Sequence, residues 1–360
     1  MQVGGEPQLL VEATTTDELL AAAREAFFES DDPWYLLGGG SNTVAADDGF
    51  AGTVIRVATR GIERVEAPEG RVRLRVAAGE NWDALVTSTV DSGWSGIEAL
   101  SGIPGSVGAA PVQNIGAYGQ EVSSTVVSVD FLDAATGEFL RIPTANLDFD
   151  YRSSVFKPSL VRPGRGGVIT AVEFELADDA GVSTPIAYAQ LATALGVELG
   201  DRVPVADVRA RVLELRRSKG MVPDPDDRDT VSCGSFFTNP IVDRSALVGI
   251  PDDAPRWETA PERHDVAVPL GEAPAAPQPV IESPVKLSAA WLIEHAGIQR
   301  GFHLPGSGAA ISSKHTLAIT NRGGASGEEI AQLARFVQSR VAAEFGVVLM
   351  PEPVLLGLSL

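Results

Sequence analysis

The sequence predicts an α+β fold that divides near residue 200, and three observations support this prediction. Helix and strand patterns alternate over the first hundred residues, as they do where helices pack on a sheet. A glycine-rich loop follows at residues 101–119. Beyond residue 200 the chain has amphipathic helices and then an apolar segment, 347–358, which is expected to be a strand.

Each element of the first part has its own signal. At residues 14–28, Leu19 and Ala23 fall on one helical face, and Thr15 and Glu18 have the spacing of a capping box. Apolar runs, alternation and turn residues predict the other elements: strands at 34–37, 53–57, 71–76 and 167–176, a helix at 81–93, and a hairpin at 125–132 and 137–142.

The second part is predicted to contain three helices before the apolar segment at its end. Helices are expected at 204–220, 283–297 and 326–346. The last of them begins with a capping box formed by Ser326 and Glu329. A segment before the second of these helices, residues 249–280, is dense in proline, alanine and acidic residues, which indicates a surface insertion.

The composition restricts the possible partners. With 48 acidic and 28 basic residues, the chain has a net charge of −20 and repels phosphate backbones, so we expect no nucleic-acid partner. No apolar run approaches the ~20 residues of a membrane-spanning helix, and the first residues do not resemble a secretory signal. The single cysteine excludes an internal disulfide and a cysteine-based zinc cluster. We expect a cytoplasmic monomer without a metal site.

Three consecutive glycines follow the strand expected at 34–37. In the run GGGSN, residues 38–42, exposed backbone N–H groups would allow an anion to approach closely, as in backbone nests that hold pyrophosphate. The dinucleotide fingerprint G-x-G-x-x-G is not met, because Thr43 occupies its third glycine position. A tight turn and a phosphate cradle are about equally supported by this run alone.

The loop at 101–119, SGIPGSVGAAPVQNIGAYG, strengthens the case for a cradle. Its glycines permit close backbone approach, Gln113, Asn114 and Tyr118 offer hydrogen bonds, and Ile103 could lie against a flat ring. A purely structural glycine loop is the alternative. Two separate glycine-rich apolar loops in the first 120 residues favour a large, mostly neutral cofactor with a pyrophosphate, namely FAD.

The segment DFDYRSSVFKP, residues 148–158, is a candidate anion site. It places Tyr151, Arg152, Ser154 and Lys157 close together in the chain. An arginine can form a two-pronged pair with a carboxylate and polarise a substrate acid. The alternative is a solvated turn.

Two further segments contain candidate reactive side chains. VSCGSFFTNP, residues 231–240, holds Cys233 and Ser235, but neither has a histidine partner or a nucleophile motif, so Cys233 is expected to be packing. In MPEPV, two prolines would fix the direction of the Glu352 carboxylate. A surface glutamate at the end of a strand is the alternative for Glu352.

In this order, the segments resemble the UDP-N-acetylenolpyruvoylglucosamine reductase (MurB) family, flavoenzymes of peptidoglycan precursor synthesis. The resemblance rests on LGGGSN, SGIPGSVGAAPVQNIGAYG, YRSSVFK, SKGMVPDP, GSFFTNP, VKLSAAWLIEHAG and the terminal PE. It implies a two-part FAD-binding domain of two small α/β subdomains, residues 1–61 and 62–203. An α+β substrate-binding domain, residues 204–360, follows and contains the insertion at 249–280.

The resemblance also implies roles for individual residues. Arg152 and Glu352 match positions that contact the enolpyruvyl carboxylate, and Ser235 matches a proton donor. The matched substrate-binding positions are Tyr151, Tyr188, Lys219 and Asn239. Non-covalent FAD would be held by Gly38, Gly39, Gly40, Ser41, Asn42, Ser101, Gly102, Ile103, Pro104, Gly105, Gln113, Asn114, Gly116, Ala117, Tyr118 and Gly119.

The implied reaction is the NADPH-dependent reduction of UDP-N-acetylglucosamine enolpyruvate to UDP-N-acetylmuramate. Because the chain has no separate NADPH domain, both substrates are expected to use one pocket in turn.

Two departures from the family pattern stand out. Ala189 follows Tyr188 where the family has glycine, which leaves a helical core tyrosine as the alternative for Tyr188. No tyrosine follows GSFFTNP to supply a second substrate contact.

Two other functions are compatible with the sequence. One is an FAD-dependent oxidase of the same superfamily, although many of those attach FAD through a histidine and this chain has none before His264. The other is a non-catalytic module that binds sugar nucleotides, which would have no need of Arg152, Ser235 and Glu352 together.

Overall fold

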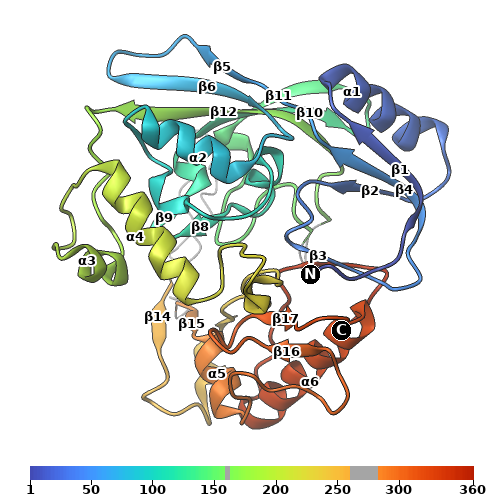
Figure 1. The fold of residues 1–360 in the computed structure, drawn as a ribbon, viewed down its shortest axis with the longest axis vertical. Coiled ribbons are helices and arrows are strands. Elements are labelled where there is room, and N and C mark those ends of the chain that lie inside the picture. Colours follow the sequence, from blue (N-terminus) through green and yellow to red (C-terminus); the bar gives the residue numbers. More distant parts are fainter. Residues whose placement is uncertain (159–162, 260–282) are drawn as a thin grey trace, which may run out of the picture.

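The computed structural model describes residues 1–158, 163–259 and 283–360. Two sheets of the N-terminal half lie on one side of the molecule, and the C-terminal helices with several short strands lie on the other (Figure 1). The helices are α1 (Thr16–Arg24), α2 (Trp82–Asp91), α3 (Ala189–Leu195), α4 (Val205–Ser218), α5 (Ala289–His295) and α6 (Gly327–Phe345).

The strands of the first half are β1 (Pro7–Ala13), β2 (Trp34–Leu37), β3 (Thr43–Ala45), β4 (Phe50–Val57), β5 (Ile62–Val65), β6 (Arg71–Ala77), β7 (Trp94–Ser95), β8 (Gly116–Ala117), β9 (Gln120–Glu121), β10 (Val126–Asp133), β11 (Phe139–Pro143) and β12 (Gly167–Asp178). Those of the second half are β13 (Ile241–Val242), β14 (Arg256–Glu258), β15 (Val285–Leu287), β16 (Ala309–Ile311), β17 (Ile319–Asn321) and β18 (Val354–Leu356).

The first sheet has the order β1-β4-β2, and both of its pairings are parallel. Helix α1 covers it through the fully buried Leu19 and Ala23. The predicted capping box of Thr15 and Glu18 is confirmed, although the helix changes at Glu25 into a π-helical turn that runs to Glu29. Strand β2 then leads directly into the triple-glycine turn.

The larger sheet is antiparallel, with the order β11-β10-β12-β6-β5, and it runs across the top of Figure 1. The predicted hairpin is confirmed as β10 and β11, and the long strand as β12. Strand β6 alternates buried and partly exposed residues as its sequence predicts. Helix α2 packs below this sheet through Trp82, which is 1% exposed and lies edge-on to Phe174.

One predicted helix is wrong at its start. The sequence predicts a helix over the whole of residues 283–297, but residues 285–287 form strand β15 and helix α5 begins only after Ser288, whose side chain caps it. The reason is a two-residue period: Val285 and Leu287 are buried, whereas Lys286 between them is only partly buried. Strand β15 is the central strand between β13 and β14.

The segment 249–280, expected to be a surface insertion, contributes strand β14 to that sheet. Its remainder from residue 260 onward lies outside the described residues. Near the chain end, the capping box of Ser326 and Glu329 is confirmed at the start of α6. No helix in the described part of the chain is long and apolar enough to cross a membrane.

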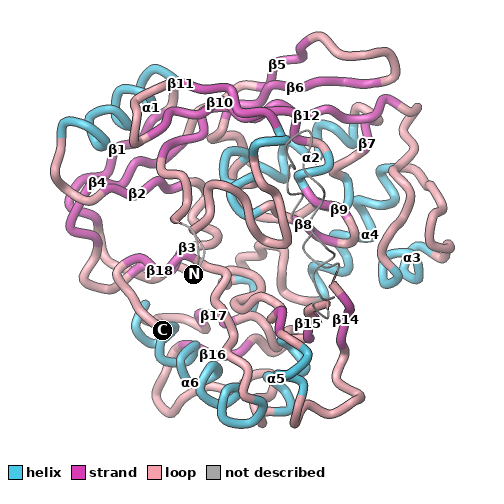
Figure 2. Tube along the Cα trace, turned by 180° about the vertical axis from the view of Figure 1, so that it is seen from behind, coloured by secondary structure: helices cyan, strands magenta, loops and turns pink. Residues whose placement is uncertain are grey.

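The apolar terminal segment is a strand only at residues 354–356, not over the whole expected range 347–358. Pro351 and Pro353 lack the N–H groups that a continuous ladder needs. Strand β18 pairs in parallel with β3, the strand that follows the triple-glycine turn. Seen from behind, β3 and β18 lie side by side near the N-terminus (Figure 2). The end of the chain is therefore brought to the first glycine turn.

Candidate active site

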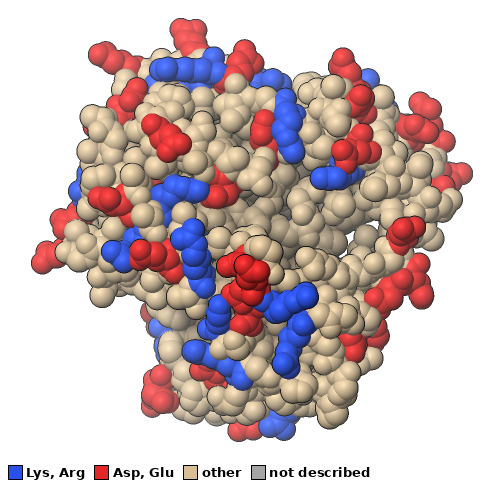
Figure 3. All heavy atoms as spheres, viewed as in Figure 1, with Lys and Arg blue, Asp and Glu red and all other residues tan. Residues whose placement is uncertain are grey.

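The two glycine-rich loops lie against each other. A Cβ built on Gly39 would be 3.0 Å from the Cα of Gly105, and one on Gly38 would be 2.5 Å from Ser106 Oγ. Ser41 Oγ donates to the Pro104 carbonyl at 3.0 Å. Side chains would prevent this approach, so the glycines are needed for the two loops to form one partly exposed backbone surface. In Figure 3 the surface is hollowed between the sheets above and the C-terminal part below.

The second loop is held from behind by α2 and α4. Asp83 accepts hydrogen bonds from the Gly102 amide at 2.6 Å and from Arg209 of α4 at 2.7 Å. Further along, Asn114 has a φ of +44°, and its side chain bonds the Asp150 carbonyl and Glu121. The loop contains short 3-10 turns and ends in the small hairpin of β8 and β9.

Arg152 is fixed by two backbone carbonyls of this loop. It donates to Gly116 O at 2.7 Å and to Asn114 O at 3.4 Å. Its own φ is +52°, an unusual conformation for a residue with a side chain. The Nε atom lies 3.6 Å from Glu352 Oε1, and both side chains are mostly buried, with 22% and 17% exposed. The structure thus brings together two residues that are 200 positions apart.

Glu352 lies between the glycine turn and the segment of Ser235. Its amide donates to the Phe236 carbonyl at 2.9 Å, and its carbonyl accepts from Asn42 Nδ2 at 3.2 Å. Burial raises the pKa of Glu352, and the charges of Arg152 and Lys157 oppose this effect. Glu352 is therefore not a surface residue at a strand end.

Ser235 follows Gly234, which has a φ of +70°, and precedes two buried phenylalanines. Phe236 bonds the Leu317 carbonyl through its amide, and Phe237 forms a bridge with Pro351. These pairings place the serine on a segment adjacent to that of Glu352. Within the described residues, the Ser235 hydroxyl has no hydrogen-bond partner in the protein, so it is available to a ligand.

Cys233 packs against the C-terminal core and its Sγ lies 3.8 Å from the Thr43 carbonyl. Burial raises the pKa of the thiol to about 11, so the reactive thiolate is scarce at neutral pH. We expect Cys233→Ala to leave turnover largely unchanged, because the thiol is not ionised and only a small side chain is lost. Steady-state kinetics with both substrates measures this, and abolished activity would contradict a packing role.

Tyr118, Tyr188 and Lys219 form a cluster at one side of the site. The tyrosine rings meet edge to face at 5.8 Å, and Lys219 Nζ lies 5.7 Å from the centre of the Tyr118 ring. Lys219 also donates to Gln190 at 3.1 Å. Tyr188 stands just before α3 and is 45% exposed, so it is not a helical core tyrosine.

Tyr151 and Asn239 lie in a second cluster, together with a lysine that is not among the predicted site residues. Lys286 of β15 has its Nζ 4.8 Å from the Tyr151 ring centre and 5.9 Å from that of Trp257. Asn239 Oδ1 accepts the Ala289 amide at 3.0 Å at the start of α5. A lysine between two buried apolar residues of a strand is the signal that could have identified Lys286.

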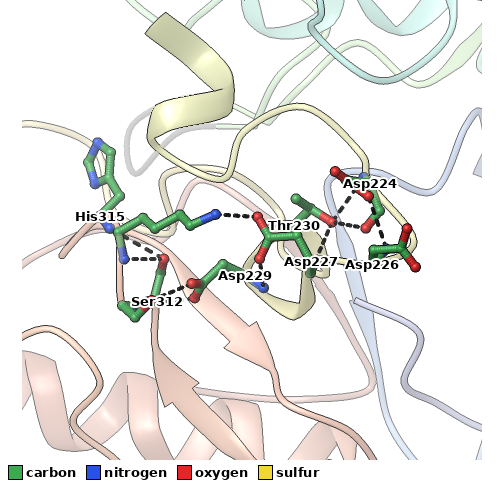
Figure 4. Close-up of polar contacts among 9 residues, drawn as sticks. Asp224, Asp226, Asp227, Asp229, Thr230, Ser312 and His315 are labelled. Carbon is green, nitrogen blue, oxygen red and sulfur yellow. Dashed lines mark hydrogen bonds and ion pairs between the residues drawn. The ribbon is translucent and has the colours of Figure 1, made fainter. Parts of the chain in front are cut away.

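The acid-rich turn after α4 is bonded to the loop between β16 and β17 (Figure 4). Asp229 accepts from the amide and hydroxyl of Ser313, and Asp227 pairs with Lys314. Thr230 closes the turn by donating to the carbonyls of Asp224 and Asp227. These contacts hold the end of α4, and hence Lys219, against the C-terminal half.

Comparison with known proteins first gives the class of protein. Residues 7–143 match a family model described as an FAD binding domain, which covers both glycine-rich loops. Residues 224–356 match a second model, described as the C-terminal domain of UDP-N-acetylenolpyruvoylglucosamine reductase, which covers Ser235 and Glu352. The fold and the site thus define an FAD-binding protein with a separate C-terminal domain.

Curated relatives then identify the family. The chain is 59% identical over 329 residues to UDP-N-acetylenolpyruvoylglucosamine reductase of Leifsonia xyli, covering 88% of this chain and 86% of the relative. It is 48% identical over 318 residues to the reductase of Salinispora arenicola, covering 88% of this chain and 82% of that relative. The chain belongs to the UDP-N-acetylenolpyruvoylglucosamine reductase family.

A solved structure has the same fold. The crystal structure of UDP-N-acetylenolpyruvylglucosamine reductase (MurB) from Thermus caldophilus superposes with a TM-score of 0.58 at 24% identity, covering 96% of this chain and 91% of that chain.

Proposed function

We propose that the protein is an FAD-dependent reductase that uses NADPH to convert UDP-N-acetylglucosamine enolpyruvate to UDP-N-acetylmuramate, in the cytoplasm and as a monomer. One observation supports this most directly. Arg152 and Glu352 are paired at 3.6 Å beside the glycine-rich loops, and the segment of Ser235 is hydrogen-bonded to that of Glu352. An anionic substrate that needs a proton would meet a cation, a carboxyl group and a hydroxyl here.

The residues of the two glycine-rich loops fit FAD. Side chains at Gly38 or Gly39 would prevent the two loops from approaching each other. Because glycine has no side chain, backbone N–H groups stay accessible to a pyrophosphate. The proposed contacts are Gly38 to Asn42, Ser101 to Gly105, Gln113, Asn114 and Gly116 to Gly119. When bound, FAD supplies transfer of a hydride from NADPH to the enolpyruvyl double bond.

The chain's own side chains would act on the substrate carboxylate and on the alpha carbon. Arg152 is pre-oriented by the carbonyls of Asn114 and Gly116, so its charge faces the place where negative charge develops. Ser235 would donate the proton to the alpha carbon. A serine hydroxyl is a weak acid, so its effectiveness depends on its position beside a strongly basic carbon.

The two clusters flanking this centre would hold the UDP-sugar. Lys219 with Tyr118 and Tyr188 lies on one side, and Tyr151 with Asn239 lies on the other. Burial lowers the pKa of Lys219, and the nearby Arg216 adds to this effect. The negative charge of an anionic ligand would oppose both effects on the pKa, so the diphosphate of the substrate is a suitable partner for Lys219.

The purified protein is expected to be yellow, with flavin absorbance near 450 nm that bleaches on addition of NADPH. The absorbance should recover without oxygen when UDP-N-acetylglucosamine enolpyruvate is added, because the enol ether is the acceptor. Recovery with oxygen alone would indicate an oxidase. Absence of flavin would indicate a binding module. Anaerobic absorbance spectroscopy distinguishes these outcomes.

A further inference from the structure

Gln113 lies at the centre of a hydrogen-bond chain that ends on Glu352. Its side-chain oxygen accepts from Asn42 Nδ2 at 3.3 Å and from Lys157 Nζ at 3.4 Å. Its Nε2 donates to Glu352 Oε1 at 3.4 Å. Because two donors occupy the side-chain oxygen, the amide must present its N–H₂ end to the carboxylate. The orientation of Gln113 is thus determined by its neighbours.

Lys157 is placed at the other end of this chain by a tethered turn. Ser154 Oγ donates to the Val112 carbonyl at 2.6 Å, and the Asn114 side chain donates to the Asp150 carbonyl at 3.1 Å. Phe156 is buried, so the turn cannot swing into solvent. These contacts hold the turn of Lys157 against the loop of Gln113.

Lys157 is unusual for a lysine because its ammonium group is largely buried and bonded to a neutral amide. Within residues 1–158, 163–259 and 283–360, it forms no salt bridge with a carboxylate. Burial lowers its pKa, and the charge of Glu352 opposes that effect. A half-buried lysine without a direct acidic partner is costly, and the contact through Gln113 is what relates it to Glu352.

We propose that Lys157, acting through Gln113, is a positioning residue that sets the orientation and the charge of the Glu352 carboxyl group. The cation holds the amide, and the amide holds Oε1 on the side facing Arg152. Lys157 stabilises the ionised carboxylate through this polarised amide. The inference rests on the proposed function, in which Glu352 acts on the substrate.

The groups that face Glu352 come from two segments. Arg152, Lys157 and Tyr151 lie in the turn after β11, and Cys233 lies before β13. The two cations favour the ionised carboxylate. Burial raises the pKa values of Tyr151 and Cys233, so both are neutral at neutral pH. Removing Lys157 therefore leaves Arg152 as the single charge opposing the burial of Glu352.

The test is the pH dependence of flavin reoxidation by the enol ether in Lys157→Met. The part of the pH–rate profile that reflects the ionisation of Glu352 should move to higher pH, because the loss of the cation raises the pKa of the carboxyl group. This direction is the same whichever protonation state is active. On an acidic limb, a shift of one pH unit lowers the rate about tenfold. Lys157→Arg should restore the wild-type profile. Flavin content and reduction by NADPH serve as controls.

A second measurement does not involve activity. The free energy of unfolding of the holoenzyme is measured over a range of pH with Glu352 present and with Glu352→Gln. The difference between the two gives the contribution of the carboxyl group, and it is determined both in the wild-type and in the Lys157→Met background. A carboxyl group whose pKa is raised by folding contributes stability at low pH that is lost as pH rises through the folded-state pKa. In Lys157→Met this loss should continue to higher pH than in the wild-type background.

Unshifted pH profiles in both measurements would overturn the inference, even if Lys157→Met is less active. A profile that shifts but is not restored by Lys157→Arg would also overturn it. Gln113→Leu removes the amide that connects Lys157 to Glu352, so it should also move the part of the profile that reflects Glu352 to higher pH. Adding Lys157→Met to Gln113→Leu should then cause little further shift, and an undiminished further shift would overturn the inference. Failure of the proposed function looks different, because the wild-type flavin would then not be reoxidised by the enol ether.

Discussion

Replacing Ser235 with alanine is expected to slow flavin reoxidation by the enol ether about 10²–10⁴-fold, while reduction by NADPH stays nearly normal. The alanine removes the hydroxyl that would donate a proton to the alpha carbon, and hydride transfer from NADPH requires no such proton. Gly234 and Phe236, on either side, determine the backbone of this segment, so the substitution leaves it in place. Anaerobic stopped-flow absorbance measures the two half-reactions separately.

Cys233→Ala is the matched control, because it removes a polar atom from the same segment. It should leave both half-reactions near their wild-type rates. An equal loss in both half-reactions for Ser235→Ala would show that the serine supports the structure and does not donate the proton.

The second large effect is expected for Arg152→Lys, which keeps the positive charge and the Cβ but loses the planar guanidinium group with its several N–H donors, referred to below as the fork. Lysine cannot bond the carbonyls of Asn114 and Gly116 while also facing Glu352 and a carboxylate. We expect kcat/KM for the UDP-sugar to fall about 10²–10³-fold. Steady-state kinetics at saturating NADPH measures this. The variant retains the positive φ strain of residue 152, so strain does not account for a loss.

Arg141→Lys is a suitable control for Arg152→Lys. Arg141 lies on β11, pairs with Asp130 and has a side chain that is 56% exposed. Its replacement should leave the kinetics unchanged. Full activity of Arg152→Lys would mean that charge alone is sufficient and that the fork has no role.

The elements that could be predicted from the sequence are those specified by nearby residues. The capping boxes at Thr15 and Ser326 and the alternation of β6 involve contacts within four residues or a two-residue period, and the structure contains all three. The helix predicted at 285–287 is wrong because three strand residues directly before a helix give too short a signal to be separated from it. Pairing with two other strands decides its conformation.

The site could be predicted only as a set of separate segments. Resemblance points to Arg152, Ser235 and Glu352, but nothing in the sequence itself indicates that their segments meet as they do in the structure. Lys286 and the contact between Gln113 and Lys157 depend on packing between elements that are distant in the chain. Gln113 was assigned to the cofactor from its loop, and its contact with Glu352 follows from the pairing of β18 with β3.

The backbone around Glu352 is hydrogen-bonded to two other segments of the chain. Its amide is bonded to Phe236, next to Ser235, and two residues later the Val354 amide is bonded to the Asn42 carbonyl in the glycine turn. A shift in either segment would therefore be transmitted to the carboxyl group within two peptide units. Residues far from the reacting atoms, on β3 or on β17 behind the Ser235 segment, become sites where substitutions can change acidity at the centre without touching the substrate. Through this short linkage, we expect small displacements in both halves of the molecule to reach the Glu352 carboxyl group.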